Sequence, residues 1–136
     1  MKRLLSGLAA AAVLSATTVS ASKSTDPSTI VLNPPAGTYT SWEPRLGDDV
    51  TFTVTYPKTL DHYGVRIQIL CYDGAGNLIY GEAGPYTQAF LLGGAMSIWY
   101  QTGGPAHCRA DLYYWSYNGG QKWNGLAYTT FDALGR

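Results

Sequence analysis

The chain has 136 residues, which is enough for one domain of ordinary size but not for two. Its nine lysines and arginines balance nine aspartates and glutamates, so the formal net charge at pH 7 is zero. A neutral chain lacks the excess positive charge that attracts nucleic acid or anionic lipid without specificity. We therefore expect neither of these as a partner.

The first 21 residues have the three-part pattern of a secretory signal peptide. Lys2 and Arg3 form a basic start, residues 4–16 form an apolar run, and residues 19–21 form the small-x-small sequence VSA. The apolar run is shorter than the roughly 20 residues that a membrane-spanning helix needs. We expect cleavage after residue 21, a secreted or cell-surface location, and no membrane contact of the processed chain. An uncleaved anchor is the alternative.

Short strands are expected to follow the signal peptide. Residues 22–35 form a polar leader that contains an edge strand over residues 28–33 and ends at a Pro-Pro break. Apolar and polar side chains alternate over residues 50–56 and again over residues 65–72, and this period of two is typical of half-buried strands. The segment DGAGN after the second of these runs predicts a turn, and a short partner strand begins at Leu78.

The C-terminal part predicts one long hairpin. Residues 107–117 and 122–133 are both strand-like, and the NGG of residues 118–120 between them is a hairpin turn. Residues 86–101 show the least regular pattern. No segment after the signal peptide has a sustained helical period, so residues 36–136 are expected to form an antiparallel sandwich or barrel.

One segment carries a resemblance to a known family. RLGDDVTFTVTYP, residues 45–57, has a Gly-Asp turn followed by a Val-Thr-Phe-Thr-Val strand. It resembles the A′–B region of immunoglobulin-like domains in secreted bacterial and phage-encoded proteins. The resemblance covers residues 28–133 as architecture and implies an all-β, antiparallel immunoglobulin-like sandwich of about seven strands.

The two cysteines depart from the antibody pattern. Cys71 falls on the third main strand and Cys108 on the penultimate one, whereas the antibody bridge joins the second strand to the penultimate one. The tyrosine-corner position, two residues before Cys108, is Ala106. We therefore expect a looser kind of immunoglobulin-like sandwich with no antigen-receptor function.

Export makes a disulfide between Cys71 and Cys108 the expected state of both cysteines. A metal site or a reactive thiol is the alternative, but His107 is the only other ligand type close in sequence. Directly opposed cysteines would be strained, so a diagonal offset between the two strands is expected. If they are nevertheless opposed, antiparallel pairing places Arg66 across from Tyr113, with its guanidinium over that ring.

The disulfide also sets the phase of the last two strands, because strand side chains alternate between the two faces. Cys71 shares its face with Val65, Ile67 and Ile69, so both cysteines are expected to point inward. The residues that then point inward are Ala110, Leu112, Tyr114, Ser116, Trp123, Ala127, Thr129 and Phe131. Those that point outward include Tyr113, Trp115, Tyr117, Asn124, Leu126, Tyr128 and Thr130.

The candidate binding surface consists mainly of these outward aromatic side chains. The surface comprises Arg66, Tyr113, Trp115, Tyr117, Leu126 and Tyr128. Tyrosine and tryptophan are enriched in protein interfaces, so the expected function is an exported, non-enzymatic module for binding or structural display by protein contact. Weak self-association through the same surface is a second form of that contact.

Two other interpretations of this surface stay open. Rings at every second strand position lie about 7 Å apart, which suits sugar stacking, so a surface polysaccharide is the alternative partner. Asn118, Gln121 and Asn124 would then bond to sugar hydroxyls. The surface can also be covered by another segment or consist of cross-strand pairs that stabilise the sheet.

No catalytic motif stands out. His62 is expected in a solvated loop and His107 at the start of a strand, and neither has a nucleophile motif beside it. The positions of the acidic residues are typical of turns and do not indicate a pair of catalytic carboxylates. Asp73 in DGAGN lacks the further ligands that a calcium loop needs. We expect no enzyme, no metal and no cofactor. A secreted hydrolase with a site assembled from distant residues is the weakest alternative.

Overall fold

A computed structural model describes residues 27–37 and 42–136, and these residues form seven strands and two short helices. The predicted signal peptide lies outside the described residues. The strands are β1 (Thr29–Asn33), β2 (Asp49–Thr55), β3 (Arg66–Tyr72), β4 (Leu78–Pro85), β5 (Phe90–Leu91), β6 (Ala106–Ser116) and β7 (Lys122–Ala133). The helices are the 3-10 helix η1 (Lys58–Tyr63) and the α-helix α2 (Ile98–Thr102).

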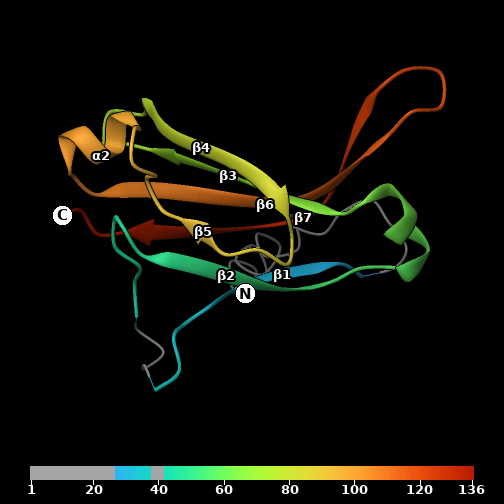
Figure 1. Cartoon of the computed structure of the whole chain (residues 1–136), viewed down its shortest axis with the longest axis horizontal. Coiled ribbons are helices and arrows are strands. Elements are labelled where there is room, and N and C mark those ends of the chain that lie inside the picture. Colours follow the sequence, from blue (N-terminus) through green and yellow to red (C-terminus); the bar gives the residue numbers. More distant parts are fainter. Residues whose placement is uncertain (1–26, 38–41) are drawn as a thin grey trace, which may run out of the picture.

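The strands form two antiparallel sheets. One sheet has the order β1-β2-β5 and the other the order β4-β3-β6-β7, as Figure 1 shows. The third, sixth and seventh strands thus share a sheet, as strands C, F and G do in immunoglobulin-like sandwiches, and the fourth strand extends that sheet. The expected all-β sandwich is therefore confirmed. Thr29–Asn33 pairs with β2 along its whole length, so this part of the predicted leader belongs to the sandwich.

Alternating side chains place the core between the sheets. Val50 and Phe52 of β2 are buried, and Ile67 and Ile69 of β3 are fully buried. Phe52 contacts Phe90 across β2 and β5, with ring centroids 6.2 Å apart. The alternation visible in the sequence is thus the division between core and solvent.

Two short helices were not anticipated from the sequence. In α2, the Ser97 hydroxyl caps the N-terminus by accepting the Tyr100 N–H at 3.0 Å, and Gly103 ends the helix in the left-handed region with φ 73°. Trp99 is fully buried and donates its indole N–H to the Gly104 carbonyl at 2.7 Å. Helices of five or six residues are too short to show a helical period in the sequence. Residues 86–101, which include most of α2, therefore show no regular pattern.

The disulfide joins Cys71 and Cys108 on the neighbouring strands β3 and β6. The expected pairing is confirmed, and both side chains are fully buried. The expected diagonal offset is wrong, because the two residues are directly opposite with Cα atoms 4.0 Å apart. Direct opposition also places Arg66 across from Tyr113, as the pairing rule required.

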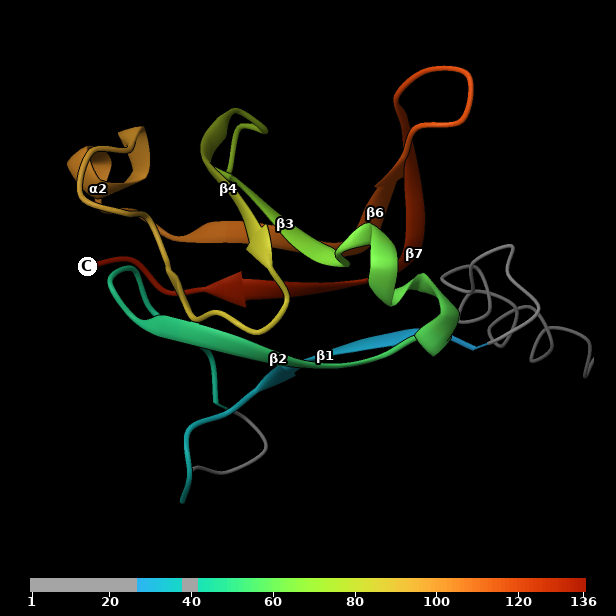
Figure 2. The ribbon, with the colours of Figure 1, turned by 45° about the vertical axis from the view of Figure 1, so that its right-hand side comes forward.

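A β-bulge interrupts the β6–β7 hairpin. Leu112 pairs with Ala127, but the next residue, Tyr113, pairs with Gly125, so Leu126 is the extra residue. A bulge bends and twists its strand. Beyond it the hairpin projects from the rest of the sheet, at the upper right of Figures 1 and 2.

The bulge overturns the predicted phase of the first part of β7. One extra residue moves every following side chain to the other face. Trp123, expected in the core, instead pairs with Trp115 and is 41% exposed. Asn124, expected outside, moves to the face of Tyr114 and Ser116. Beyond the bulge toward the C-terminus, the predicted phase holds.

Within the described part of the chain, no helix has the length and apolar character needed to cross a membrane.

Candidate functional site

Three rings gather on the outer face of the projecting hairpin. Tyr113 and Trp115 come from β6 and Trp123 from β7, and we call these three residues the hairpin cluster. Tyr113 and Trp115 share a face because they are two positions apart on one strand. Trp123 joins them only because of the bulge, which turns this part of β7 over.

The three rings have different roles in the cluster. Tyr113 is the base, since its side chain is only 4% exposed. Trp123 stacks on it with centroids 5.3 Å apart and planes at 24°, and Trp115 meets it edge-on at 6.1 Å and 89°. Trp123 keeps 41% of its surface exposed, so it presents an indole to solvent from a fixed support.

Gly125 makes room for this stack. A Cβ atom at Gly125 would lie 2.9 Å from the six-membered ring of the Trp123 indole, closer than real Cβ atoms approach other heavy atoms. Gly125 is also the residue that pairs with Tyr113. Because Gly125 has no side chain, the Trp123 indole can pack over the backbone of β7 and reach the ring of Tyr113.

The opposite face of the hairpin is braced. Tyr114 stacks on Tyr63 of η1 with centroids 4.7 Å apart and planes at 30°. The Asn124 side-chain amide donates to the Ser116 hydroxyl at 3.1 Å and to the Lys122 carbonyl at 3.0 Å. These contacts restrain the two strands that carry Trp115 and Trp123. The cluster is therefore supported by contacts on the opposite face of the hairpin.

One cation contacts the cluster directly. Arg66 of β3 donates from Nε to the Tyr113 hydroxyl at 3.4 Å, whereas Lys122 pairs with Ser116 and belongs to the opposite face of the hairpin. The expected position of the Arg66 guanidinium over the Tyr113 ring is wrong, because its contact is with the hydroxyl at the ring edge. Residues 112–131 contain no aspartate or glutamate.

Arg109, Asp111 and Tyr128 form a second group on the same sheet face, and its two charges are paired with each other. Arg109 makes two-pronged hydrogen bonds to the Asp111 carboxylate at 2.9 to 3.1 Å and lies over the Tyr128 ring at 3.9 Å. These bonds to Asp111 raise the pKa of the Arg109 guanidinium. Asp111 is only 8% exposed, so its charge is matched within the protein. Arg109 also covers one face of Tyr128, which is therefore no open platform.

The predicted site residues separate into three groups. Tyr117 is exposed at 65%, and Trp115 and Tyr128 are half-buried. Tyr113 and Leu126 were expected on the exposed surface, and this is wrong, because they are 4% and 5% exposed. Trp123 covers Tyr113, and Leu126 packs into the core cluster at the bulge.

Sequence reasoning missed Trp123, the most prominent ring of the site. A signal for it was present, since a glycine inside a strand pattern often marks a bulge or a close approach. Gly125 stands in such a position, two residues after Trp123. Treating β7 as a regular strand hid the change of phase.

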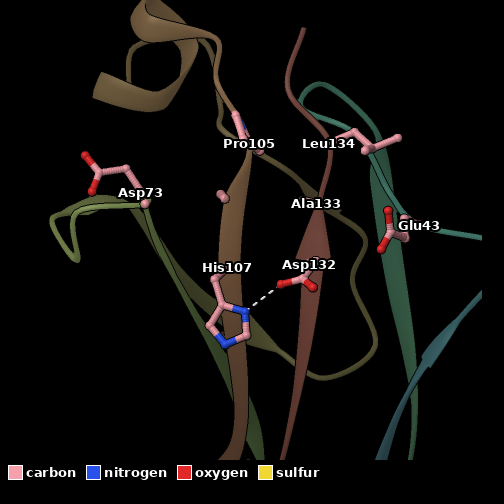
Figure 3. Close-up of a pocket in the computed structure, with 9 residues that line it drawn as sticks. Glu43, Asp73, Pro105, His107, Asp132, Ala133 and Leu134 are labelled. Carbon is pink, nitrogen blue, oxygen red and sulfur yellow. Dashed lines mark hydrogen bonds and ion pairs between the residues drawn. The ribbon is translucent and has the colours of Figure 1, made fainter.

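A separate open pocket of about 370 Å³ lies at the other end of β6 and β7. Its centre is a pair between His107 Nδ1 and Asp132 Oδ1 at 2.6 Å, as Figure 3 shows. Both side chains are about two-thirds exposed, and ion pairs of that exposure contribute little to stability. The carboxylate of Asp73 points away from His107, and Glu43 lies on the far side of β7.

Neither a nucleophile bonded to the histidine nor a metal-binding group is found at this pocket in the part of the chain that the structure describes. No hydrogen bond among the described residues joins His107 to a serine, threonine or cysteine side chain. Residues 27–37 and 42–136 also contain no group of three histidine, cysteine, aspartate or glutamate side chains placed to hold a metal ion. Asp73 instead stabilises its own turn, accepting the N–H groups of Ala75 and Asn77 at 2.9 Å. The expectation of a non-enzymatic protein stays a prediction.

Comparisons with models of protein families, with curated proteins and with solved structures gave no significant match to this chain.

Proposed function

We propose that the chain is an exported binding module whose hairpin cluster makes contact with a partner protein. The observation that carries this proposal is the combination of exposure and support at Trp123. Its indole is 41% exposed, yet it is stacked on Tyr113, which is buried. Aromatic anchors that are ordered before binding lose little conformational entropy when they enter a partner's pocket.

The position of the cluster supports the same function. The hairpin projects beyond the rest of the sandwich, so its outer face can approach another protein without interference from the sheets (Figure 2). Tyr117, 65% exposed, lies next to the tip and adds apolar surface. Binding loops and hairpins carried by a rigid scaffold are a common arrangement in recognition domains.

The ring geometry favours protein over polysaccharide. A sugar platform needs several ring faces that lie in one plane and are open to solvent. Here the Trp115 ring stands at 89° to that of Tyr113, and Trp123 covers Tyr113. One open indole suits an irregular protein surface better than a row of sugar rings.

A binding comparison tests the proposal. A random linear peptide library is panned against the full chain and against Trp123→Ala, and both proteins are incubated with cellulose, chitin and peptidoglycan. We expect peptides to be enriched on the native chain but not on Trp123→Ala. The polysaccharides should retain neither protein.

Tyr100→Ala is the matched control, because Tyr100 is 49% exposed but lies on α2, away from the cluster. This variant should enrich the same peptides as the native chain. Retention on a polysaccharide that depends on Trp123 would contradict protein binding and favour the carbohydrate alternative. Equal enrichment on all three proteins would show that the cluster is not the binding site.

A further inference from the structure

We infer that the partner presents an acidic side chain beside a bulky apolar one, with the carboxylate bound by Arg66 and the apolar group on Trp123. This inference rests on the proposed function and names the chemistry of the partner. It assigns Arg66 a direct role in selecting the partner.

The first argument is an imbalance of charge around the hairpin cluster. The ion pairs among the described residues are His107–Asp132 and Arg109–Asp111, and Arg66 belongs to neither. Lys122 is exposed at the start of β7, but it pairs with Ser116 and so belongs to the opposite face of the hairpin. Residues 112–131 carry no acidic side chain, and Asp111 of β6 is already bound to Arg109, so the hairpin supplies no free carboxylate to Arg66. Complementary charge on a partner would correct this imbalance and speed association.

The second argument is the geometry of Arg66. Its Nε atom donates to the Tyr113 hydroxyl at 3.4 Å, which directs the guanidinium toward the cluster. Within the described part of the chain, no hydrogen bond engages its terminal nitrogens. A guanidinium has five donors in a planar fork, and that fork matches the two oxygens of a carboxylate. Arg66 can therefore keep its contact with Tyr113 while its terminal nitrogens donate hydrogen bonds to a partner's carboxylate.

The third argument comes from the contrast with Arg109 on the same sheet face. Arg109 is held by the carboxylate of Asp111 and lies on the Tyr128 ring. Arg66 lies across from Tyr113, but it is paired with none of the carboxylates in residues 27–37 and 42–136. Arg109, Asp111 and Tyr128 thus form an arrangement of guanidinium, carboxylate and apolar ring within this protein. A partner's carboxylate and apolar group would complete a similar arrangement at Arg66.

The small number of cations favours an acidic peptide segment over a polyanion. Binding to a polyanion depends on many charges that together release counterions, as in nucleic acid recognition. The cluster has one cation in direct contact with it, Arg66, in a chain with zero net charge. One carboxylate beside an apolar anchor uses both features of the site.

The experiment uses the library selection on the full chain and continues with the enriched peptides as probes. We expect these peptides to contain aspartate or glutamate next to a large apolar residue. Labelled copies are then titrated against the native chain, Arg66→Gln, Arg66→Lys and Lys58→Gln. Arg66→Gln should raise Kd about tenfold or more, because a charge-assisted hydrogen bond is lost. Arg66→Lys should recover part of the affinity, and Lys58→Gln, a neutralisation on η1, should leave Kd unchanged.

A second measurement assigns the carboxylate. Replacing the peptide's acidic residue by its amide should weaken binding to the native chain but not to Arg66→Gln, since the two changes remove the same contact. Thermal melts establish that Arg66→Gln remains folded. Heparin and alginate are titrated in parallel as polyanion probes, and neither should bind.

Three outcomes would overturn the inference, and each has a distinct meaning. Peptides that depend on Trp123 but lack acidic residues, or that bind Arg66→Gln as tightly as the native chain, would leave the proposed function standing and remove the role of Arg66. Binding of heparin or alginate through Arg66, without peptide binding, would identify a polyanion as the ligand. A library without peptides that depend on Trp123 would reject the proposed function, and the inference with it.

Discussion

The indole of Trp123 stacks on the ring of Tyr113, with centroids 5.3 Å apart and planes at 24°. The two residues lie on different strands and come together across the bulge at Leu126. The stack buries Tyr113 and leaves Trp123 41% exposed. It therefore creates both the support and the open ring of the candidate site.

Gly125→Ala should displace the Trp123 indole while leaving the fold intact. The new Cβ atom would lie 2.9 Å from the indole, and Gly125 does not have a positive φ that would strain alanine. We expect the tryptophan emission spectrum to change, peptide capture to be lost, and the free energy of unfolding to change by about 1 kcal/mol or less.

Gly104→Ala is the control for that experiment, because its Cβ atom would meet nothing within 4 Å. Emission and binding should then match those of the native chain. If Gly125→Ala retained both the native emission and full binding, the stack on Tyr113 would not be needed for recognition.

Alanine substitutions should show different losses of stability for Tyr113, the buried base of the cluster, and for Trp115, which meets it edge-on. Leu112 is fully buried, and Leu112→Ala should lower the free energy of unfolding by about 2–5 kcal/mol. Tyr113→Ala should cost about 2–4 kcal/mol, since Tyr113 is buried beneath Trp123. Trp115→Ala should cost only about 1 kcal/mol, because this half-buried ring loses mainly its edge contact.

Urea unfolding curves of the three variants provide the measurement. Tyr113→Phe is the control, since it keeps the ring beneath Trp123 and removes only the hydroxyl. A large loss for Trp115→Ala combined with a negligible one for Tyr113→Ala would mean that the two rings have the opposite roles.

Removal of the disulfide should destabilise the sandwich without changing its strand order. Cys71 and Cys108 are separated by 37 positions, and closing a loop of this length in the unfolded chain contributes about 4 kcal/mol in the chain-entropy model. We expect the double variant Cys71→Ala/Cys108→Ala to unfold at a lower urea concentration, by an amount corresponding to about 2–4 kcal/mol. Unfolding of the native chain with and without a thiol reductant measures the same effect, and coincident curves would contradict it.

Alkaline pH should weaken the fold through two buried tyrosines. Burial, and then a hydrogen bond to Asp61, raises the pKa of Tyr56, while burial and a hydrogen bond to Glu82 raise that of Tyr80. The unfolded tyrosines titrate near pH 10, below the pKa of the folded ones. The stabilisation is therefore complete below about pH 10 and is lost as the pH rises toward the folded-state pKa.

The free energy of unfolding, measured by urea titration at neutral and at strongly alkaline pH, should fall at the higher pH. Tyr80→Phe is the informative variant, because it removes one of the two ionisable hydroxyls. Its loss of stability with pH should be smaller than that of the native chain. An equal loss in both proteins would assign the effect to other groups.

The N-terminal pattern predicts cleavage after Ala21, so that the processed chain begins at Ser22. Intact-mass measurement of the protein from the culture medium of an expressing host provides the check. Replacing Ala21 by a bulky residue should slow processing, because the cleavage site requires small side chains. Secreted protein that retains Met1 would contradict the prediction.

The sequence by itself determined the sandwich and most of its core. Alternation over residues 50–56 and 65–72 is a local property of strands, so the buried and exposed faces could be assigned without knowing their neighbours. Two cysteines leave one possible pairing within the chain, and its inward phase placed Ala110 and Leu112 correctly in the core. The hairpins β3–β4 and β6–β7 also followed from the turn sequences between their strands.

Only the tertiary structure decided the candidate site. The bulge depends on how β6 and β7 pair over their whole length, and a single unpaired residue, Leu126, moves Trp123 from the predicted core to the surface. The burial of Tyr113 depends in turn on the indole that crosses Gly125. A period of two reports the face of a residue only while the register is unbroken, and the register is a property of two strands together.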